Sequence, residues 1–159
     1  MIKNINLKQL AISLFISLGV GILASILTAD SFMVYSGLTK PPLSPPAWLF
    51  PVVWTILYIL MGISAYMVYQ SDDDFKYVAL VIYGVQLIFN FFWSIIYFNM
   101  GNVLFAFVWL IMLWVLIVAM IISFAQVNKT AALLQIPYLL WVTFAGYLNL
   151  ALYLLNRPM

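Results

Sequence analysis

The sequence lacks the residues on which most soluble enzymes and metal sites depend. None of its 159 residues is cysteine or histidine. Without cysteine there are no disulfides, thiolate metal sites or cysteine nucleophiles. Without histidine the chain loses the commonest metal ligand and the usual general base near pH 7. We therefore predict no metal site, and any chemistry has to proceed without conventional acid–base machinery.

Charge is also scarce. Charged residues make up 6% of the chain and the residues AVILMFWYC 67%, whereas soluble domains have about 25% and 45–50%. So little charge cannot hydrate the surface of a soluble fold, and so much apolar surface excludes a disordered chain. A net charge of +2 is too small for a nucleic-acid footprint. The composition predicts an integral membrane protein with lipid, and no nucleic acid, around it.

Five long apolar runs predict an all-α integral membrane protein, a bundle of five transmembrane helices forming one domain over residues 1–159. The runs cover residues 9–28, 48–69, 77–98, 103–126 and 131–155. Each is long enough to cross a hydrocarbon core of ~30 Å. Backbone groups in lipid must be satisfied within their own segment, which favours helices. The first run is longer than a signal-peptide core and four more follow it, so we expect it to be retained.

The distribution of basic residues predicts an orientation. One side of the five spans holds Lys3, Lys8, Lys76 and Lys129, whereas the other holds Lys40 and Arg157. Basic residues concentrate on the cytoplasmic side of membrane proteins. We therefore expect a cytoplasmic N-terminus, with the loop 29–47 and the C-terminus outside.

The connection 29–47 is the longest between the predicted spans. It contains two Pro-Pro pairs, which disfavour helix. It also carries five large apolar side chains: Phe32, Met33, Tyr35, Leu38 and Leu43. Two interpretations stay open, an interfacial loop resting on the lipid headgroups and a lid over the mouth of the bundle.

The polar residues within the spans are amides and hydroxyls. Gln86, Asn90 and Ser94 recur at four-residue spacing on one face of the third span, and Asn149 lies in the fifth. They serve either as interhelical hydrogen bonds or as the few polar anchors of an apolar cavity. The spans contain no ionisable acid or base of the kind that ion-coupled transporters use. The chain also has no nucleotide-binding loop, which argues against ATP-driven transport.

Aromatic residues are abundant, at 18% of the chain. Trp48 begins the second span and fits an interfacial belt, but Trp54, Trp93 and Trp141 lie within their spans. Trp54 and Tyr58, four residues apart, present one aromatic face. Such faces either pack in the bundle or line a slot suited to a large, flat, apolar ligand.

The first span carries a stripe of small residues. Ser17, Gly21 and Ser25 recur at every fourth position. Such spacing permits close helix approach, either within the bundle or between two copies of the chain.

Three sequence blocks together resemble a known family. Residues 35–62 contain Tyr-x-Gly-Leu-x-Lys-Pro, then Pro-Pro-x-Trp, then Pro-x-x-Trp-x-x-Leu-Tyr-x-x-Met-Gly. Residues 86–93 read Gln-Leu-Ile-Phe-Asn-Phe-Phe-Trp, and residues 137–149 read Pro-Tyr-Leu-Leu-Trp-Val-Thr-Phe-Ala-Gly-Tyr-Leu-Asn. In this order the blocks resemble those of bacterial members of the TspO family. These tryptophan-rich sensory proteins are related to the mitochondrial translocator protein, the peripheral benzodiazepine receptor.

The resemblance implies a bundle whose first loop covers a ligand cavity. It implies binding of tetrapyrroles, including protoporphyrin IX and haem, and of isoquinoline carboxamide and benzodiazepine ligands. It further implies light-dependent oxidative degradation of protoporphyrin, with the porphyrin as ligand or substrate and no cofactor required. A homodimer in a bacterial cell membrane is the expected assembly.

The resemblance also assigns site residues. Trp54 and Trp141 correspond to positions associated with porphyrin degradation. The expected ligand-binding set, to which the residue analysis contributes Tyr58 and Gln86, is Ala24, Phe50, Pro51, Val53, Trp54, Tyr58, Gln86, Asn90, Trp93, Trp141, Ala145 and Leu148.

Other functions are compatible with the same residues. The protein is alternatively a transporter, carrier or sensor for porphyrins or similar apolar molecules. Leu150, Tyr153 and Arg157 fit a short pattern proposed for cholesterol contact, but that pattern arises easily in Leu- and Tyr-rich helices. We do not expect a cholesterol function, and whether porphyrin degradation amounts to enzymatic turnover stays open.

Overall fold

The computed structural model describes residues 4–31 and 37–157, and every regular element within these ranges is helical. The elements are α1 (Leu7–Thr28), η1 (Ala29–Ser31), α3 (Leu49–Tyr69), α4 (Lys76–Ser94), η2 (Ile95–Asn99), α5 (Val103–Val127), α6 (Lys129–Leu133) and α7 (Ile136–Asn156). Five helical segments are long and apolar enough to cross a membrane. The predicted all-α architecture with five spans is confirmed.

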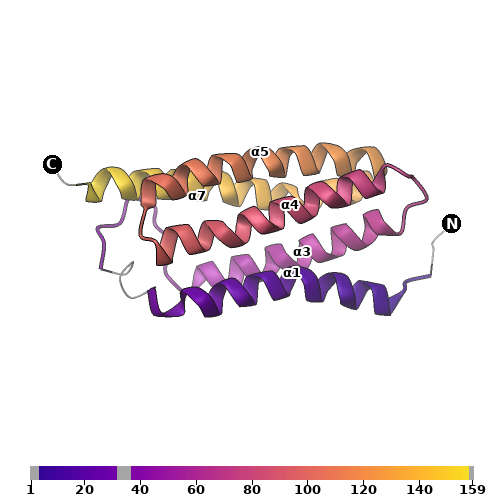
Figure 1. Ribbon diagram of the computed structural model, residues 1–159, viewed down its shortest axis with the longest axis horizontal. Helices are drawn as coiled ribbons and strands as arrows, with labels where there is room; N and C mark the ends of the chain where they lie inside the picture. The colour runs from indigo at the N-terminus through magenta and orange to yellow at the C-terminus, as the bar shows by residue number, and fades with distance from the viewer. Residues whose placement is uncertain (1–3, 32–36, 158–159) are drawn as a thin grey trace.

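The spans lie side by side in alternating directions, with the N- and C-termini at opposite ends of the bundle (Figure 1). α1 packs against α3, α4 against α5, and α5 against α7, while α4 also contacts α1 and α3. We call the end that holds the N-terminus and the α3–α4 loop the N-terminal end. The other end, which holds residues 37–48 and the end of α7, is the C-terminal end.

Polar and glycine residues set several of the helix boundaries. The side chain of Asn6 accepts a hydrogen bond from Gln9 N at the start of α1. Asn102 caps α5 in the same way, directly after Gly101, whose φ is +61°. Glycine tolerates this left-handed conformation, and asparagine is a preferred N-cap. The break expected between the third and fourth spans is therefore confirmed and explained.

The fifth span is less regular than the apolar run predicts. It begins as the short helix α6, capped by Asn128, and α7 starts only at Ile136. Pro137 lies in the first turn of α7, where the missing N–H of proline is tolerated.

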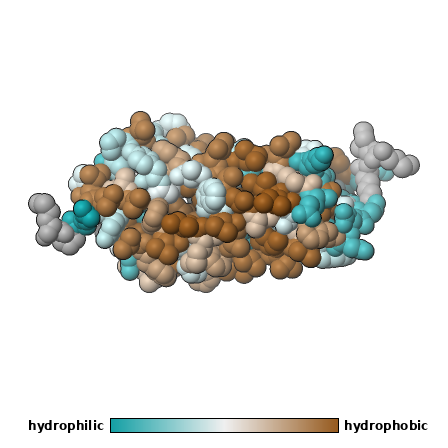
Figure 2. Space-filling model, turned by 90° about the horizontal axis from the view of Figure 1, so that it is seen from above, coloured by the Kyte–Doolittle hydropathy of each residue, from teal (hydrophilic) through white to brown (hydrophobic). Residues whose placement is uncertain are grey.

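The outer surface of the bundle is apolar along its middle. Large side chains such as Phe15, at 78% exposure, and Val81, at 65%, point outward. In Figure 2 the middle of the visible face is mostly hydrophobic and the hydrophilic residues gather toward the ends. A surface of this kind is stable only in contact with lipid, and the chain is an integral membrane protein.

The small-residue stripe of α1 makes contacts within the bundle. A Cβ atom added to Gly21 would lie 2.4 Å from Cε2 of Tyr58, and one added to Gly62 would lie 2.7 Å from Oγ of Ser17. Ser17 itself is fully buried. The stripe therefore allows α1 and α3 to approach closely, which is the first of its two interpretations.

The described part of the loop between α1 and α3 is attached to α7. The backbone N–H of Thr39 donates to Oδ1 of Asn156, at 2.9 Å, and Nδ2 of Asn156 donates to the carbonyl of Thr39, at 2.8 Å. The hydroxyl of Tyr147 donates to the carbonyl of Pro42. Residues 37–48 thus lie against the C-terminal end of the bundle, as a lid would. Phe32, Met33 and Tyr35 lie outside the described residues.

Candidate functional site

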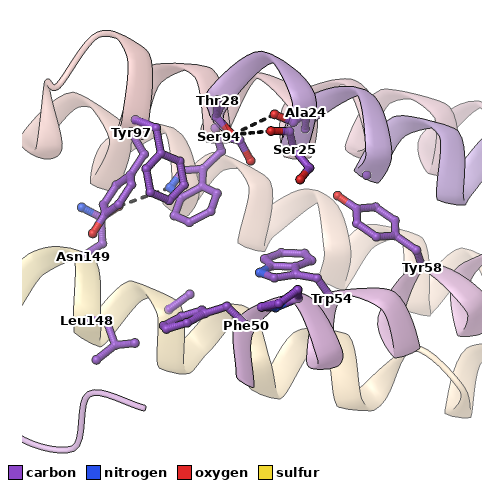
Figure 3. A pocket seen from close by; sticks show the side chains of 15 residues that line it. Ala24, Ser25, Thr28, Phe50, Trp54, Tyr58, Ser94, Tyr97, Leu148 and Asn149 are labelled. Carbon is purple, nitrogen blue, oxygen red and sulfur yellow. Dashed lines mark hydrogen bonds between the residues drawn. The ribbon is translucent and has the colours of Figure 1, made fainter. Parts of the chain in front are cut away.

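A cavity of about 220 Å³ lies inside the C-terminal half of the bundle, between α1, α3, α4, η2 and α7 (Figure 3). None of the described residues that line it is charged. The lining residues are Gly21, Ala24, Ser25, Thr28, Phe50, Pro51, Trp54, Tyr58, Trp93, Ser94, Tyr97, Phe98, Ala145, Leu148 and Asn149. An apolar, aromatic lining with few polar groups is typical of a small-molecule site.

Trp54 forms the centre of the aromatic wall. Its ring centroid lies 5.7 Å from that of Tyr58, 6.4 Å from that of Trp93 and 6.3 Å from that of Tyr138. The Trp93 ring in turn stacks on Tyr97 at 5.2 Å. These rings come from three spans, so the wall also holds the bundle together.

The periodicity of α3 explains why it dominates one side of the cavity. Phe50, Trp54 and Tyr58 follow one another at four-residue spacing, which places them on one helix face. Small residues on α1, among them Ala24 and Ser25, face them across the cavity (Figure 3). Bulky side chains on one helix and small ones on the other leave space between the two.

Most of the polar groups in the cavity wall already form hydrogen bonds within the protein. Nε1 of Trp93 donates to Oδ1 of Asn149 at 3.2 Å, and Nδ2 of Asn149 donates to the carbonyl of Val103 at 2.8 Å. The hydroxyl of Thr28 donates to the carbonyl of Ala24. These bonds fix the wall, so that ligand contacts there are mainly those of rings and aliphatic groups.

A chain of buried hydrogen bonds begins at Tyr58 and runs behind the wall. The Tyr58 hydroxyl donates to Oδ1 of Asn90 at 2.8 Å, and Nδ2 of Asn90 donates to the Tyr138 hydroxyl at 2.7 Å. The Tyr138 hydroxyl donates to Oε1 of Gln86 at 2.8 Å. Of these four side chains only Tyr58 lines the cavity. Gln86 and Asn90 thus make interhelical hydrogen bonds, one of the two roles considered for them.

Trp141 lies beside the cavity without lining it. Its ring contacts Phe50 edge-on at 5.9 Å and Phe144 at 5.7 Å. The Trp141 Nε1 atom is buried and has no hydrogen-bond partner among the described residues. Val53 likewise packs against the core rather than lining the cavity. A ligand contact by Gln86, Asn90, Trp141 or Val53 therefore stays a prediction.

The other eight expected residues are brought together by the fold. Ala24, Phe50, Pro51, Trp54, Tyr58, Trp93, Ala145 and Leu148 all line the cavity. They come from four spans that are far apart in the sequence.

Seven further lining residues lie outside the expected ligand-binding set: Gly21, Ser25, Thr28, Ser94, Tyr97, Phe98 and Asn149. Ser94 and Asn149 had been considered as polar anchors of a cavity. Several carried a usable signal, since Gly21 and Ser25 belong to the small stripe and Ser94 shares a face with Asn90. Tyr97 and Phe98 are neighbours in sequence, and both belong to the π-helical turn η2. A wide turn of this kind is not visible in sequence periodicity, although such turns are frequent at functional sites.

A second cavity, of about 520 Å³, adjoins the first at the C-terminal end. It shares Tyr97 and Phe98 with the first cavity, and its lining includes Leu38, Tyr153 and Arg157. The two rings therefore separate an interior cavity from one that reaches the end of the bundle.

Five spans, four of which line an uncharged aromatic cavity, define a helical membrane protein with an internal pocket. The model of the TspO/MBR family matches residues 12–154, and the chain belongs to this family.

Proteins from distant organisms are similar to the chain. "Tryptophan-rich protein TspO" of Chlorobaculum tepidum is 39% identical over 96% of this chain and 99% of its own length. "Tryptophan-rich sensory protein" of Cereibacter sphaeroides is 37% identical over 78% of each chain. "Translocator protein" of Bos taurus is 35% identical over 84% of this chain and 80% of its own.

Proposed function

We propose that the protein binds tetrapyrroles in the aromatic cavity and promotes the light-dependent oxidative degradation of protoporphyrin IX. The observation that carries the proposal is the group of rings formed by Trp54, Tyr58 and Trp93, which comes from α3 and α4 and lines an uncharged cavity. Offset contacts between rings favour a flat aromatic ligand. Family membership supports the same ligand class.

The size of the cavity implies that it expands on binding. Its volume of about 220 Å³ is below the roughly 300–1,000 Å³ of ligand pockets. Tyr97 and Phe98 separate it from the second cavity of about 520 Å³. Rotation of these two side chains joins the spaces, so that a macrocycle can occupy both.

The two cavities also suggest how a tetrapyrrole is oriented. The apolar macrocycle lies against Trp54, and its carboxylates point toward the C-terminal end, where Arg157 lines the second cavity. A guanidinium binds carboxylates in a bidentate manner. The unpartnered N–H of Trp141, beside Phe50, offers one further donor to the ligand.

The chemistry then comes from the excited porphyrin and oxygen. Light excites the bound porphyrin, which reacts with oxygen while the protein holds it in place. The indoles of Trp54 and Trp141 orient the ring and take part in electron or oxygen transfer. This mechanism requires no metal or histidine, in keeping with the sequence.

The test combines dark binding with illumination. Purified protein is titrated with protoporphyrin IX in the dark while tryptophan quenching is followed, and the complex is then illuminated while porphyrin absorbance is recorded. We expect saturable quenching and porphyrin loss faster than that of free porphyrin. Trp54→Phe and Trp141→Phe should abolish the accelerated loss.

Trp114→Phe is the matched control, because Trp114 is a partly exposed indole whose N–H donates to Thr143 Oγ1. It should behave as the unmodified protein does. Degradation at the normal rate in both Trp54→Phe and Trp141→Phe contradicts the mechanism, whereas the absence of saturable quenching contradicts the proposal that protoporphyrin IX is a ligand.

A carrier of porphyrins is the second candidate function. The observation that favours it is the adjoining cavity at the C-terminal end, which gives a ligand a route between the interior and the membrane surface. The charged residues within the spans, Lys8, Asp30, Lys76 and Lys129, all lie at span ends. Because no charged group lies in the middle of a span to couple to an ion, the movement would be facilitated diffusion. Porphyrin flux across sealed vesicles in the dark distinguishes this function from degradation.

We further propose a homodimer in a bacterial cell membrane, with the N-terminal end in the cytoplasm. Among the described residues, Lys8, Lys76 and Lys129 lie at or near helix starts of the N-terminal end, whereas Lys40 and Arg157 lie at the other end. The remaining cation of the count, Lys3, lies outside the described residues. Cross-linking in membranes and labelling of cysteines placed singly at each end test these two points.

A further inference from the structure

Most serine and threonine hydroxyls in the spans are bonded to the backbone of the protein. In the five long helices α1, α3, α4, α5 and α7, six of them donate to a main-chain carbonyl: those of Ser13, Ser17, Thr28, Thr55, Ser123 and Thr143. Lipid tails offer a hydroxyl neither a donor nor an acceptor, so such bonds are expected within a membrane. A hydroxyl that lacks one needs another explanation.

Three hydroxyls in these helices, on Ser25, Ser64 and Ser94, make no hydrogen bond with any residue that the structure describes. Ser64 is fully buried and lines neither of the two C-terminal cavities. Ser25 and Ser94, in contrast, both line the aromatic cavity. Their hydroxyls are therefore free to bond to a ligand there.

Both serine side chains are accessible from the cavity. Ser25 is exposed, and Ser94 is half-buried with a hydroxyl oxygen that protein atoms do not fully enclose. The two residues lie on α1 and α4, which contact each other. Figure 3 shows them across the cavity from Phe50 and Trp54. A ligand that fills the space between these two walls therefore comes into contact with both serines.

Helix packing does not account for Ser25, although it belongs to the small-residue stripe of α1. Ser17 and Gly21, the other members of the stripe, lie against Gly62 and Tyr58 of α3, where an added Cβ atom would clash. One turn beyond Gly21 the cavity separates the two helices, and Ser25 faces this space. The small size of Ser25 is thus not required for a helix contact.

Ser94 likewise differs from the residues that share its helix face. The amides of Gln86 and Asn90, which precede it at four-residue spacing, are bonded to the hydroxyls of Tyr138 and Tyr58. Ser94 is the last residue of α4 and the one member of this row that lines the cavity. The protein therefore uses the polar groups of Gln86 and Asn90 and leaves that of Ser94 to a ligand.

The chemistry of the wall indicates which ligand group fits the two serines. None of the described residues that line the cavity is charged, so a charged ligand group placed there would be buried without a partner, which is costly. A serine hydroxyl both donates and accepts a hydrogen bond. A neutral hydroxyl on the ligand, which also does both, complements it fully.

The position of the serines indicates which part of a tetrapyrrole they contact. The proposed function, on which this inference rests, places the ligand carboxylates beside Arg157 in the second cavity. The first cavity then holds the opposite edge of the macrocycle. In protoporphyrin IX this edge carries vinyl groups, which have no hydrogen-bonding atom and leave both serines without a partner.

We propose that Ser25 and Ser94 are specificity residues, which favour tetrapyrroles that carry hydroxyl groups on the ring edge opposite the carboxylates. Each serine exchanges a hydrogen bond with such a hydroxyl, while the macrocycle lies against Trp54. The cavity thus discriminates between tetrapyrroles by a neutral substituent and not by charge.

The test compares haematoporphyrin IX with mesoporphyrin IX. Both keep the carboxylates of protoporphyrin IX, but in place of the vinyl groups the first has hydroxyethyl groups and the second has ethyl groups. The full chain, purified in detergent, is titrated with each porphyrin in the dark while tryptophan quenching is followed. The quantity compared is the Kd for mesoporphyrin divided by the Kd for haematoporphyrin. Differences in solubility and in partition into detergent cancel when this ratio is compared between variants.

Two variants and a matched control locate the contact. Ser25→Ala and Ser94→Ala should each lower the Kd ratio by about 2- to 10-fold, as expected for the loss of a net hydrogen bond. Ser123→Ala removes a hydroxyl that lines neither C-terminal cavity and donates to the carbonyl of Ala119, so it should leave the ratio unchanged.

Thermal stability without ligand separates this role from a structural one. The hydroxyls of Ser25 and Ser94 make no hydrogen bond among the described residues, and alanine favours helix over serine. Neither substitution should therefore lower the melting temperature. A lower melting temperature in both variants, a Kd ratio unchanged in both, or an equal fall of the ratio in Ser123→Ala each overturns the proposal.

Failure here is distinguishable from failure of the proposed function. Saturable quenching by both porphyrins with a Kd ratio that does not depend on the serines overturns this inference alone. The absence of saturable quenching by either porphyrin overturns both. Because the titrations are made in the dark, their outcome does not depend on whether the protein degrades porphyrin.

Discussion

The Tyr58 hydroxyl donates a 2.8 Å hydrogen bond to Oδ1 of Asn90 and so connects the cavity wall to the buried polar chain behind it. Tyr58 is also in ring contact with Trp54, at 5.7 Å. One side chain therefore holds the central indole on one side and joins α3 to α4 on the other. The position of the aromatic wall therefore depends on a buried polar contact between α3 and α4.

This contact predicts a non-additive effect of two substitutions. Tyr58→Phe leaves Asn90 Oδ1 without its donor. Asn90→Leu leaves the Tyr58 hydroxyl without its acceptor and also removes the bond from Asn90 Nδ2 to the Tyr138 hydroxyl. Each should destabilise the protein by about 1 kcal/mol, since interhelical hydrogen bonds in membranes contribute ~0.6 kcal/mol on average and at most ~1.7. The double variant should lose less than the sum of the two.

Unfolding in sodium dodecyl sulfate, followed by circular dichroism, measures these differences. Thr55→Val, which removes an exposed hydroxyl bonded to its own helix, is the control on α3. Strict additivity in the double variant is the result that contradicts the coupling.

Close approach of α1 and α3 gives a second prediction. In Gly62→Ala the new Cβ lies 2.7 Å from Ser17 Oγ and 3.0 Å from Leu14 Cα. Because a backbone atom is involved, the helices have to separate, and we expect a loss of about 1–3 kcal/mol.

Gly19→Ala is the matched control for Gly62→Ala, since its Cβ meets nothing within 4 Å. Alanine favours helix over glycine, so stability should rise by up to about 1 kcal/mol. The same unfolding experiment measures both variants. Destabilisation by Gly19→Ala, or tolerance of Gly62→Ala, disagrees with the packing described.

The sequence was sufficient to predict the number of spans, their helical nature and the break at residues 99–102. These features follow from the length of each apolar run and from its lack of charge, which are properties of the run itself and do not depend on its neighbours. Of the twelve expected ligand contacts, eight lie in the cavity wall, and of these the family resemblance supplied seven and the residue analysis supplied Tyr58. The orientation of each helix face depends on all of the neighbouring helices. For this reason the sequence predicted the orientation of individual side chains less well than the spans. Asn90 shares a helix face with Ser94, yet Asn90 bonds to Tyr138 whereas Ser94 lines the cavity.

The irregular part of the backbone could not be predicted from the sequence. The π-helical turn Ile95–Asn99 closes with a bond from Met100 N to the carbonyl of Ile95, and periodicity arguments assume 3.6 residues per turn throughout. The buried N–H of Trp141, which has no hydrogen-bond partner among the described residues, could not be predicted either, because a missing partner depends on every neighbouring helix.

The attachment of residues 37–48 to α7 gives a third prediction. The double variant Asn156→Ala/Tyr147→Phe removes both bonds to Asn156 and the bond from Tyr147 to Pro42. The Thr39 N–H then has no side-chain acceptor, and its hydrogen exchange should be about 2- to 10-fold faster, as expected for the loss of a net hydrogen bond. Exchange followed by mass spectrometry on the peptide around Thr39 measures this.

Leu154→Ala, an exposed position on the same helix, is the control for the loop variant and should leave the exchange unchanged. If the double variant also exchanges at the original rate, these bonds do not hold the loop.

The shared wall of the two C-terminal cavities gives a fourth prediction, which concerns kinetics. Phe98 lines both cavities and contacts the Tyr97 ring edge-on at 4.9 Å. Phe98→Ala removes one of the two rings that a ligand has to displace, so protoporphyrin IX should associate and dissociate several-fold faster with little change in Kd. Stopped-flow tryptophan quenching in the dark gives both rates. Phe92→Ala, at an exposed ring on the same span, should leave them unaltered. Unchanged rates in Phe98→Ala indicate that the ligand enters elsewhere, whereas a large loss of affinity indicates that the ring is a binding contact and not a barrier.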